Sequence, residues 1–324
     1  MRPAHSTMDR VSSRTPERAT EPQTTSTVMM IRPAGFGANP ETAASNAFQR
    51  ASNSGSVEVL ARARREFDAL VAALRANGVE VVVVEDTLEP EKPDAVFPNN
   101  WVTFHAGGTA VLYPLLAPSR RREARLEVLE ELERRGVFTR RRLVDLRQRD
   151  ESDGFLEGTG SLVLDRVARV AYACLSPRTS PEMLARFGLE LGYEVVAFRG
   201  FDARGVAIYH TNVMMAVGTA VAVACLEAIR GPAERRAVEE SLEASGHELV
   251  PLTLAQIDEF AGNLLELRAR SGEALFVLSA RARRALRPDQ VEVLERHGRL
   301  VSAELHTIET HGGGSARCMI AEVF

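Results

Sequence analysis

The sequence lacks the features that would assign it to a membrane, secreted or nucleotide-binding class. No apolar run approaches the roughly 18 residues that a membrane-spanning helix requires, so no membrane partner is expected. Three cysteines, an odd number in a chain of 324 residues, do not form a disulfide framework and favour a reducing compartment, the cytoplasm. No G-x-G-x-x-G motif follows the first predicted strand, and the usual dinucleotide signal is therefore missing.

The sequence also has no strong excess of charge of either sign. It contains 40 Lys and Arg against 44 Asp and Glu, a net charge of -4, whereas a nucleic-acid partner would call for a basic face. Two arginine-rich stretches, at 120–125 and 140–142, are interpreted as solvated faces. No pair of Cys or His residues has the spacing of metal ligands, and the sequence predicts neither a metal nor another cofactor.

Residues 1–27 differ in composition from the rest of the chain. They are rich in Ser, Thr, Pro, Arg and Glu and contain no apolar core, which is typical of a disordered tail rather than of a signal peptide. Residues 28–324 have a globular composition and ample length to bury a core, and they are predicted to form one domain. The sequence leaves the oligomeric state open, a homodimer included.

A unit of a short apolar hairpin, a helix and a further strand recurs along this domain. Copies begin near positions 101, 160, 212 and 263, and a spacing of roughly 50 residues is typical of closed repeat architectures. The helix predicted at 54–77, with Gly78 as its stop, and the strand after it supply a fifth unit that the residues after Cys318 complete. A ring of five strand-and-helix units explains this pattern better than a doubly wound sheet.

Polar or reactive residues recur just ahead of each hairpin, in positions where the rest of the unit is apolar. These junctions are the stretches FPNN (97–100), LEGTG (156–160), YHTN (209–212), AGN (261–263) and GGGSARC (312–318). If the units form a ring, the junctions converge on one axis. The three glycines before Cys318 permit a tight turn and close approaches that a Cβ would block, which suits the delivery of its sulfur to that axis.

The convergence brings together Cys318, His210, Glu157, Asn100 and Asn212. A thiol, an imidazole and a carboxylate are the parts of an activated nucleophile: the thiolate attacks, the imidazole moves protons, and the carboxylate orients the imidazole or the substrate. Taken singly, each has a structural alternative, because a lone histidine is often a satisfied core residue and a lone glutamate often caps a turn. Their recurrence at equivalent junctions favours a functional site.

Other candidate residues are interpreted as structural. Cys174 and Cys225 lie within apolar strands and are assigned to the core. Asn263, at the fourth junction, is interpreted as a turn residue, with contact to a ligand as the alternative. Three histidines are interpreted as loop or surface residues, namely His105, His306 and His311.

Six blocks in order along the chain resemble one family of enzymes. They are MIRPAGFGANPETAASNAFQ, DAVFPNNWVTFH, VLYPLLAPSRRREAR, FLEGTGSLVLD, IYHTNVMMAVG and GGGSARCMIAEVF. The blocks resemble the amidinotransferase and guanidine-modifying enzymes, which include arginine deiminases and dimethylarginine dimethylaminohydrolases, and most specifically the citrulline-utilisation hydrolase branch. The resemblance extends from Met30 to Phe324 and implies the α/β fold of that family, a five-bladed pseudo-symmetric α/β propeller (the pentein fold).

The resemblance also implies roles for individual residues. The nucleophile of the family falls on Cys318, its catalytic histidine on His210 and the carboxylate that partners this histidine on Glu157. Four further positions are implied to bind substrate: the acid of an Asp-x-x-Phe motif and its aromatic wall, and two candidates for holding a substrate carboxylate, that is Asp94, Phe97, Arg32 and Arg199.

Two departures from the family pattern bear on the substrate. Enzymes of this family that act on guanidinium groups carry Asp where this chain has Asn100 and Asn212, and the acid that ends a Glu-Gly-Gly-Asp pattern is missing from EGTGS. A cationic guanidinium is well served by carboxylates. A neutral ureido group offers a carbonyl acceptor and N–H donors, which amide side chains match, whereas buried carboxylates would be left unpaired against it. The amides therefore favour a ureido substrate and assign Asn100 and Asn212 to substrate binding.

The activity implied by these residues is hydrolysis of citrulline to ornithine, ammonia and carbon dioxide through a covalent intermediate on Cys318. The partner is then a small amino-acid substrate. Alternatives within the family are an arginine dihydrolase, an arginine deiminase and an amidinotransferase. Outside catalysis, the alternatives are a pseudoenzyme that binds an amino acid and a ribosome anti-association factor of the same fold, which would need none of the three reactive residues.

Overall fold

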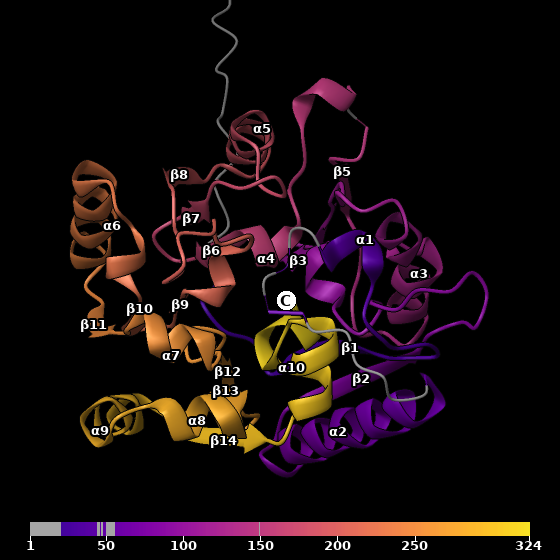
Figure 1. Cartoon of the computed structure of the whole chain (residues 1–324). Helices are drawn as coiled ribbons and strands as arrows, with labels where there is room; N and C mark the ends of the chain where they lie inside the picture. Colours follow the sequence, from indigo (N-terminus) through magenta and orange to yellow (C-terminus); the bar gives the residue numbers. More distant parts are fainter. Residues whose placement is uncertain (1–20, 44–45, 47, 50–55, 149) are drawn as a thin grey trace, which may run out of the picture.

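Five small sheets surround the centre of the molecule, and helices form its outer ring (Figure 1). The computed structural model describes residues 21–43, 46, 48–49, 56–148 and 150–324. Each sheet has three strands, of which the first two are antiparallel and the last two parallel. The prediction of a five-bladed α/β propeller is therefore confirmed.

The blades share one strand order from the axis outwards. In chain order they are β3 (Val102–His105), β4 (Thr109–Leu112) and β5 (Arg142–Asp145); β6 (Leu162–Asp165), β7 (Val170–Cys174) and β8 (Glu194–Phe198); β9 (Met215–Val217), β10 (Val221–Ala224) and β11 (Glu248–Pro251); β12 (Leu265–Arg268), β13 (Ala274–Ser279) and β14 (Arg299–Ala303); and β15 (Ala321–Val323), β1 (Thr27–Arg32) and β2 (Glu80–Glu85). The last blade confirms that the residues after Cys318 complete the fifth unit, because β15 pairs with β1.

The parallel strands of each blade require a crossover, and helices supply it. The crossover helices are α2 (Ser56–Ala76), α3 (Leu126–Arg134), α5 (Pro181–Leu191), α6 (Pro232–Ala244) and the pair α8 (Ala280–Ala285) and α9 (Pro288–His297). Four shorter helices are α1 (Pro40–Ala43), α4 (Gly158–Ser161), α7 (Leu254–Asp258) and α10 (His306–Gly312). Figure 1 shows the longer helices at the rim and α4 and α10 near the axis.

Helix α2 illustrates how the sequence produces a crossover. Phe67, Leu70 and Leu74 recur at helical spacing and are fully buried, so one face of the helix packs on the sheet. The chain then leaves the helix through Gly78 at φ 80°, a left-handed conformation that glycine adopts without strain. This confirms Gly78 as the stop of the helix predicted at 54–77, of which residues 54–55 lie outside the described residues.

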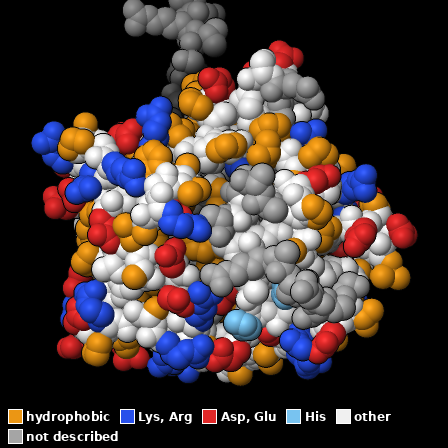
Figure 2. Space-filling view, viewed as in Figure 1, with side chains coloured by type: hydrophobic (Ala, Val, Ile, Leu, Met, Phe, Trp, Pro, Cys, Tyr) orange, Lys and Arg blue, Asp and Glu red, His pale blue; other side chains and the backbone are white. Residues whose placement is uncertain are grey.

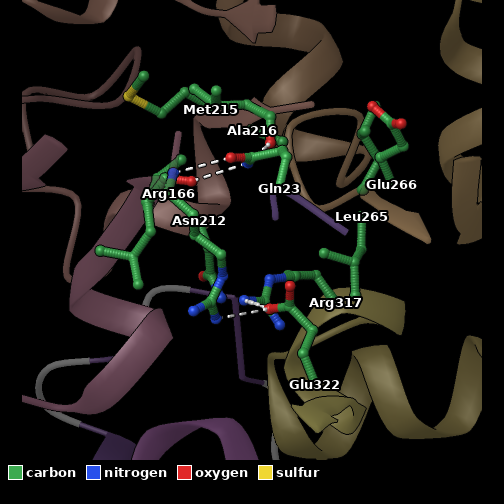
Figure 3. Close-up of a pocket in the computed structure, with 13 residues that line it drawn as sticks. Gln23, Arg166, Asn212, Met215, Ala216, Leu265, Glu266, Arg317 and Glu322 are labelled. Carbon is green, nitrogen blue, oxygen red and sulfur yellow. Dashed lines mark hydrogen bonds and ion pairs between the residues drawn. The ribbon is translucent and has the colours of Figure 1, made fainter. Parts of the chain in front are cut away.

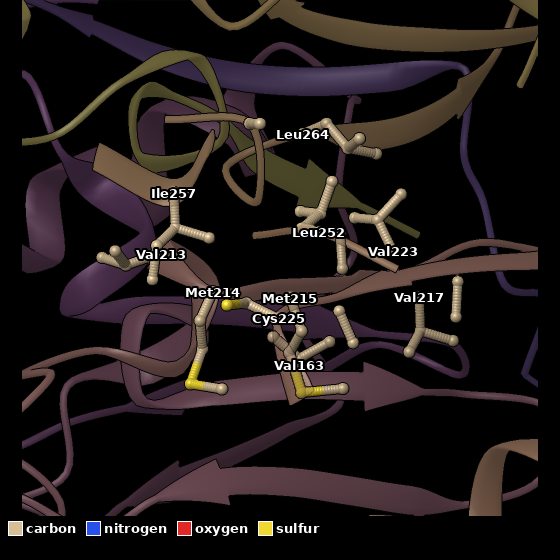
Figure 4. Packing of buried hydrophobic residues seen from close by; sticks show 14 of the residues in the cluster. Val163, Val213, Met214, Met215, Val217, Val223, Cys225, Leu252, Ile257 and Leu264 are labelled. Carbon is tan, nitrogen blue, oxygen red and sulfur yellow. The ribbon is translucent and has the colours of Figure 1, made fainter. Parts of the chain in front are cut away.

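The core fills the spaces between neighbouring blades. In the cluster drawn in Figure 4, Met214, Met215 and Cys225 pack with Val223 and Leu252 from adjoining strands and loops, and all five side chains are buried. Truncating such a side chain to alanine typically costs about 2 to 5 kcal/mol, so these contacts fix the blades relative to one another. The interpretation of Cys225 as a core residue is confirmed, and Cys174 is equally buried.

A short segment ahead of β1, residues 21–26, crosses the back of the propeller; we call it the N-terminal strap. Its Glu21, Gln23 and Thr25 make hydrogen bonds with the innermost strand of every blade. The partners are His105 of β3, Leu164 of β6, Val217 of β9, Arg268 of β12 and Val323 of β15. Of the tail expected at 1–27, residues 1–20 lie outside the described residues, whereas the strap is packed on the domain.

The front surface carries charged side chains of both signs around its rim, as Figure 2 shows. Elsewhere on the surface, exposed charged side chains pair with one another, as Arg296 does with Glu248 and Arg299 with Glu273. Within the described part of the chain, no helix is both long and apolar enough to cross a membrane. The interpretation of His105 and His311 as loop or surface residues is wrong, because His105 is a buried member of β3 and His311 is buried in α10.

Candidate active site

Single helical turns place the predicted site residues at the front end of the axis. Each turn stands immediately before the inner strand of a blade. The turns are η1 (Pro98–Asn100), α4 (Gly158–Ser161), η4 (Thr211–Val213) and η6 (Ala316–Met319). The N-cap residues immediately before the first three turns are Phe97, Glu157 and His210, and Cys318 lies in the last turn. The prediction that the junctions converge on one axis is therefore confirmed by the architecture.

Close packing at the axis explains two of the glycines. A Cβ on Gly160 would lie 2.4 Å from Asn100 Nδ2 and 2.8 Å from His210 Nδ1, so a larger residue there would displace both side chains. A Cβ on Gly312 would lie 2.7 Å from the Phe97 ring. The glycine-rich turn before the cysteine thus allows the chain to pass directly over the aromatic wall of the site.

The thiol of Cys318 is buried against two amides. Asn263 Nδ2 lies 3.2 Å from Cys318 Sγ, and Asn212 Nδ2 lies 3.6 Å from the same sulfur. Only 4% of the Cys318 residue surface is exposed. Asn263 was interpreted as a turn residue, and its backbone does close a turn on Phe260 O, but its side chain also contacts the sulfur.

His210 and Glu157 form a buried pair, with His210 Nε2 2.8 Å from Glu157 Oε2. Burial lowers the pKa of His210 to about 4, against the opposing pull of Glu157, so the imidazole is neutral at neutral pH. Burial alone would raise the pKa of Glu157, but Arg178, His210 and Arg120 outweigh it and hold that pKa well below its usual range. A neutral imidazole beside a fixed carboxylate is ready to accept a proton and to hold it as imidazolium.

Two arginines complete the polar wall. Arg120 makes a bidentate pair with Glu123 at 2.9 Å for each contact, and its Nη1 donates to Asn100 Oδ1 at 3.0 Å. Arg178 Nη1 donates to Glu157 Oε2 at 3.3 Å. Both guanidinium groups are buried, and neither residue was predicted from the sequence. The interpretation of the stretch at 120–125 as a solvated face is wrong for Arg120, which is 3% exposed.

Asp94 lies beside Arg120 in the lining of the same cavity. Its Oδ2 accepts a hydrogen bond from Asn39 Nδ2 at 2.7 Å and lies 3.7 Å from Arg120 Nε. Burial raises the pKa of Asp94, and Arg120 opposes this effect. The carboxylate therefore stands in the cavity with one close amide donor and one guanidinium nearby.

These side chains line one cavity at the front end of the axis. Its lining includes residues of the loop after β1 as well as those from the junctions, namely Thr42, Asn46, Asp94, Phe97, Asn100, Arg120, Arg178, Tyr209, His210, Gly312, Gly313, Gly314 and Cys318. The structure thus brings Asp94, Phe97 and Asn100 together with His210 and Cys318. Glu157 lies behind His210, and Asn212 lies behind Cys318.

The two arginines chosen from the sequence lie elsewhere. Arg32 pairs with Asp68 of α2 at 2.8 Å at the outer side of its blade. Arg199 is 64% exposed and pairs with Glu234 of α6 at 3.3 Å. Neither lines the cavity, so the structure does not place them where a substrate carboxylate would meet Cys318. Among the described residues, Arg120 and Arg178 are the arginines that line this cavity.

Residues of the loop after β1 also contact the site, which was not predicted from the sequence. Asn39 donates to Asp94, Asn46 Nδ2 donates to Gly312 O at 3.1 Å, and Arg178 Nη2 donates to Thr42 O at 3.4 Å. The position of this polar loop in the sequence could have predicted these contacts, because the loop follows the first strand of the ring and must return across the front face. Its side chains hold the carboxylate, the glycine turn and one arginine in place.

The back end of the axis has a second cavity, shown in Figure 3. Arg317 Nη2 donates to Glu322 Oε2 at 2.8 Å, and Arg166 Nη2 lies 3.7 Å from the same oxygen. Gln23 of the N-terminal strap covers this end of the axis, and its Oε1 accepts a hydrogen bond from Arg166 N at 2.8 Å. Asn212 lines this cavity too, so it separates the back cavity from the sulfur. Across residues 21–43, 46, 48–49, 56–148 and 150–324, no group of three His, Cys, Asp or Glu side chains is arranged to hold a metal ion.

The fold and this constellation define a member of the amidinotransferase superfamily with the pentein fold. The family model described as N,N dimethylarginine dimethylhydrolase, eukaryotic, matches residues 32–324, and the chain belongs to that family. No curated protein matches the chain in a search by sequence. The family is thus one of hydrolases by its own description.

Solved structures share the fold at low sequence identity. ArgZ, an arginine dihydrolase from the ornithine-ammonia cycle in cyanobacteria, is 18% identical with a TM-score of 0.70, over 92% of this chain and 40% of that one. The chain therefore spans about two fifths of the length of that protein. The N-terminal domain of ArgZ bound to substrate is 18% identical with a TM-score of 0.69, over 92% of this chain and 97% of that one. A dimethylarginine dimethylaminohydrolase adduct with S-methyl-L-thiocitrulline is 16% identical with a TM-score of 0.62, over 91% and 98%.

Proposed function

We propose that this protein is a cysteine-dependent hydrolase of ureido and guanidino amino acids, and that it converts citrulline to ornithine, carbon dioxide and ammonia. Cys318 is the nucleophile, His210 moves the protons, and Glu157 orients His210. Asp94, Asn100, Arg120 and Arg178 bind the substrate. The scheme uses only side chains of this chain.

The observation that carries this proposal is the orientation of the Asn100 amide. Arg120 has only donors, so the Asn100 atom 3.0 Å from its Nη1 must be the oxygen, and Nδ2 points away from Arg120. Among the described residues, this buried Nδ2 has no hydrogen-bond partner. It lies beside His210, because the Cβ position of Gly160 is within 2.8 Å of both Asn100 Nδ2 and His210 Nδ1.

A free N–H donor at this position discriminates between substrates. The carbonyl oxygen of a ureido group accepts a hydrogen bond, whereas the guanidinium of arginine offers donors only. Leaving a buried donor unpaired costs about 1 to 3 kcal/mol, so a ligand that pairs with Asn100 Nδ2 gains that amount over one that does not. The amide therefore favours citrulline over arginine in the first encounter.

The first half of the reaction forms a bond from Cys318 Sγ to the ureido carbon. The neutral His210 takes the thiol proton and holds it as imidazolium against Glu157. The tetrahedral intermediate then collapses, the C–N bond breaks, and His210 gives the proton to the leaving amine. The product of this half is an amine and a carbamoyl thioester on Cys318.

The second half reverses the proton transfers. His210 takes a proton from water, the resulting hydroxide attacks the carbamoyl carbon, and the C–S bond breaks to restore the thiol. The released carbamate loses carbon dioxide to give the second amine. The sum is citrulline and one water to ornithine, ammonia and carbon dioxide, so that atoms and charge balance with no other reactant.

The amino-acid end of the substrate is assigned to the two buried arginines. Arg120 and Arg178 are the cations that line the cavity, and a guanidinium matches a carboxylate in a bidentate geometry. Asp94, whose Oδ2 lies 3.7 Å from Arg120 Nε, accepts N–H groups beside that arginine.

A second candidate function is an arginine dihydrolase, favoured by Asp94. Among the described residues, Asn39 is the one hydrogen-bond donor to its buried carboxylate, Arg120 lies 3.7 Å away, and a substrate guanidinium would add further N–H donors and charge. ArgZ is described as an arginine dihydrolase, and structures of AgrE, which has a similar fold, contain L-arginine or ornithine. In such a reaction arginine and water first give citrulline and ammonia, and the citrulline then reacts as above.

Incubation of the purified full chain with citrulline, arginine and N,N-dimethylarginine in separate reactions tests these functions. Ornithine, citrulline, ammonia and dimethylamine are followed by mass spectrometry, with Cys318→Ala as the matched control. Ornithine from citrulline alone supports the proposal, and ornithine from both citrulline and arginine supports the dihydrolase. Citrulline that accumulates from arginine or from dimethylarginine, or no product from any substrate, would overturn the citrulline hydrolase.

A further inference from the structure

We infer that Asn263 is a catalytic residue whose amide stabilises the thiolate of Cys318 that forms when His210 takes the thiol proton. The inference rests on the proposal that Cys318 is the nucleophile, but it does not depend on which ureido or guanidino compound is the substrate. Its basis is the contact of Asn263 Nδ2 with Cys318 Sγ at 3.2 Å, on which neither the family resemblance nor the proposed reaction draws.

The orientation of the Asn263 amide is fixed by two backbone groups. Its Oδ1 lies 3.0 Å from Arg317 N, and a backbone N–H can only donate. Its Nδ2 lies 3.0 Å from Asn212 O, and a carbonyl can only accept. An exchanged amide would place oxygen against oxygen and N–H against N–H. Nδ2 is therefore the atom that faces the sulfur.

Asn263 Nδ2 carries two hydrogens, and the sulfur of Cys318 accepts a hydrogen bond from one of them. One of the two Nδ2 hydrogens is used by Asn212 O, and the other points to Cys318 Sγ. The sulfur therefore always receives a hydrogen bond from Asn263, whether the thiol is protonated or not. Because hydrogen bonds to an ionised group are stronger than those to a neutral one, this contact favours the thiolate.

The amide oxygen of Asn212 is poorly placed to accept an S–H proton. Asn212 Oδ1 lies 3.9 Å from Sγ, while Asn212 Nδ2 is closer at 3.6 Å. Two amide donors thus lie nearer to the sulfur than the one amide acceptor. Such an arrangement matches the hydrogen-bonding needs of a sulfur that accepts rather than donates.

The backbone around Asn263 is built to hold the amide in this position. Phe260 has φ 62°, an uncommon left-handed conformation for a bulky residue, and Asn263 N donates to Phe260 O at 2.9 Å. A Cβ on Gly262 would lie 2.4 Å from Val213 O, so this turn packs directly on η4. The left-handed Phe260 and the close packing of Gly262 show that the backbone conformation of this turn is tightly constrained.

Other titratable and charged groups face the sulfur and set the background for its ionisation. His210 and Tyr209 approach from the segment before η4, and Asp94, Arg120 and Arg178 face it across the cavity. On its own turn, Arg317 directs its guanidinium to Ile320 O and Glu322. A substitution at position 263 leaves these residues in place, so a difference in the pH dependence of Cys318 alkylation between variants reports on the Asn263 amide.

Alkylation of Cys318 as a function of pH tests the inference without a substrate. The full chain is treated with iodoacetamide over a pH series, and modified Cys318 is quantified by peptide mass spectrometry, which separates it from Cys174 and Cys225. Asn263→Ala removes the donor, and the pH midpoint of alkylation should rise by about one to two units. Asn263→Asp places a carboxylate beside the sulfur, and the midpoint should rise further.

The control is Asn77→Asp, the same charge change at the end of α2, where Asn77 Nδ2 donates to Ala73 O. It should leave the midpoint unchanged. Aspartate has the shape of asparagine and keeps an oxygen for Arg317 N. If Asn263→Ala shows no thermal unfolding transition and is therefore not folded, the alkylation midpoint of Asn263→Asp tests the inference. Wild-type midpoints in Asn263→Asp would overturn the inference.

The outcome separates this inference from the proposed function. Midpoints that rise in a protein with no activity on citrulline leave Asn263 as the thiolate donor and reject the substrate. Citrulline turnover with unmoved midpoints does the reverse.

Discussion

Among the described residues, two buried histidines make a hydrogen bond with a carboxylate, one at each end of the axis, and only one of these two lines the cavity that contains Cys318. At the front, His210 Nε2 lies 2.8 Å from Glu157 Oε2. At the back, His105 Nδ1 lies 3.0 Å from Glu21 Oε1 of the N-terminal strap. Burial lowers the pKa of both histidines, and arginines lie near both carboxylates.

The difference lies in the second nitrogen of each ring. His105 Nε2 is 3.0 Å from Thr103 Oγ1, so both nitrogens of His105 are used inside the fold. Within the described part of the chain, hydrogen bonds occupy only Nε2 of His210, and its ring lines a cavity with Cys318. A proton shuttle needs one nitrogen held and the other open. The pair itself is therefore weak evidence for catalysis, and the unoccupied nitrogen is the stronger evidence.

Both carboxylates are hydrogen-bonded, Glu157 by Leu116 N, Arg178 and His210. Glu21 receives hydrogen bonds from Arg166, Arg169, Tyr193 and His105, which satisfy it completely as a structural clamp for the strap. Burial would raise the pKa of Glu21, but these partners hold it well below its usual range. The front wall instead keeps a free donor on Asn100. This donor belongs to the lining of the cavity that contains Cys318, where a ligand can pair with it.

The largest expected effect is at the sulfur. Cys318→Ala removes the atom that forms the covalent intermediate, and turnover should fall by more than about 1,000-fold while the thermal unfolding midpoint stays near that of the wild type. The matched control is Cys225→Ala, a buried cysteine in the core that should retain activity and lose stability. Retained turnover in Cys318→Ala would exclude the covalent scheme.

The comparison of the two histidines predicts opposite phenotypes. His210→Gln removes the proton shuttle, and kcat should fall by about 100- to 10,000-fold with little loss of stability. His105→Gln leaves Glu21 with one fewer ideal partner, and the free energy of unfolding should fall by about 1 to 3 kcal/mol with kcat retained. Steady-state kinetics and urea unfolding of both variants check this. Equal losses of activity would mean that the back pair also serves the reaction.

The pH dependence of stability follows from the same histidines. The pKa of His210 is about 4 in the folded protein and near 6.5 in an unfolded chain, so the unfolded state binds the proton more tightly. Stability is therefore complete above pH 6.5 and is lost as the pH falls from 6.5 towards 4, by about 3 kcal/mol for this group. His105, whose pKa is also lowered, adds loss below the same pH.

Urea unfolding at a series of pH values measures this effect, with His210→Gln as the variant in which the His210 contribution is absent. Below about pH 4.5, protonation of Glu157 and Glu21 should continue the loss in both proteins, because both carboxylates have lowered pKa values. A wild-type stability that is flat between pH 6.5 and 4.5 would contradict the assignment of neutral buried histidines.

Much of the fold was predictable because each local signal agreed with the ring. The recurrence of hairpin, helix and strand set the number of blades, and the residues ahead of each hairpin set the axis. Cys318, His210 and Glu157 were found in this way because a repeat exposes residues that break its apolar pattern. The identity of the family was carried by the same junctions.

The misses have physical causes as well. Arg120 stands in a run of arginines whose composition is that of a solvated face, and it is buried because Glu123, Asn100 and Asp94 surround its guanidinium. The N-terminal strap has the polar composition of a tail because it binds backbone edges and charged side chains rather than a core. Arg32 stands at the end of a strand, but its side chain turns outwards to Asp68. Sequence pattern reports burial on average and cannot report the partner that makes one charged side chain an exception.

The smallest effects separate the arginines that line the cavity from those that do not. Arg178→Gln should raise KM for citrulline by about 10-fold or more, because a charge-assisted hydrogen bond to the substrate carboxylate is worth about 1.5 to 3 kcal/mol. Arg199→Gln makes the same change at an exposed pair with Glu234, and surface pairs contribute about 0 to 1 kcal/mol, so KM should change by less than about twofold. Steady-state kinetics of the two variants measures the difference. A larger rise of KM in Arg199→Gln than in Arg178→Gln would return the carboxylate site to the position first assigned from the sequence and would leave the buried arginines as supports for Glu157 and Asn100.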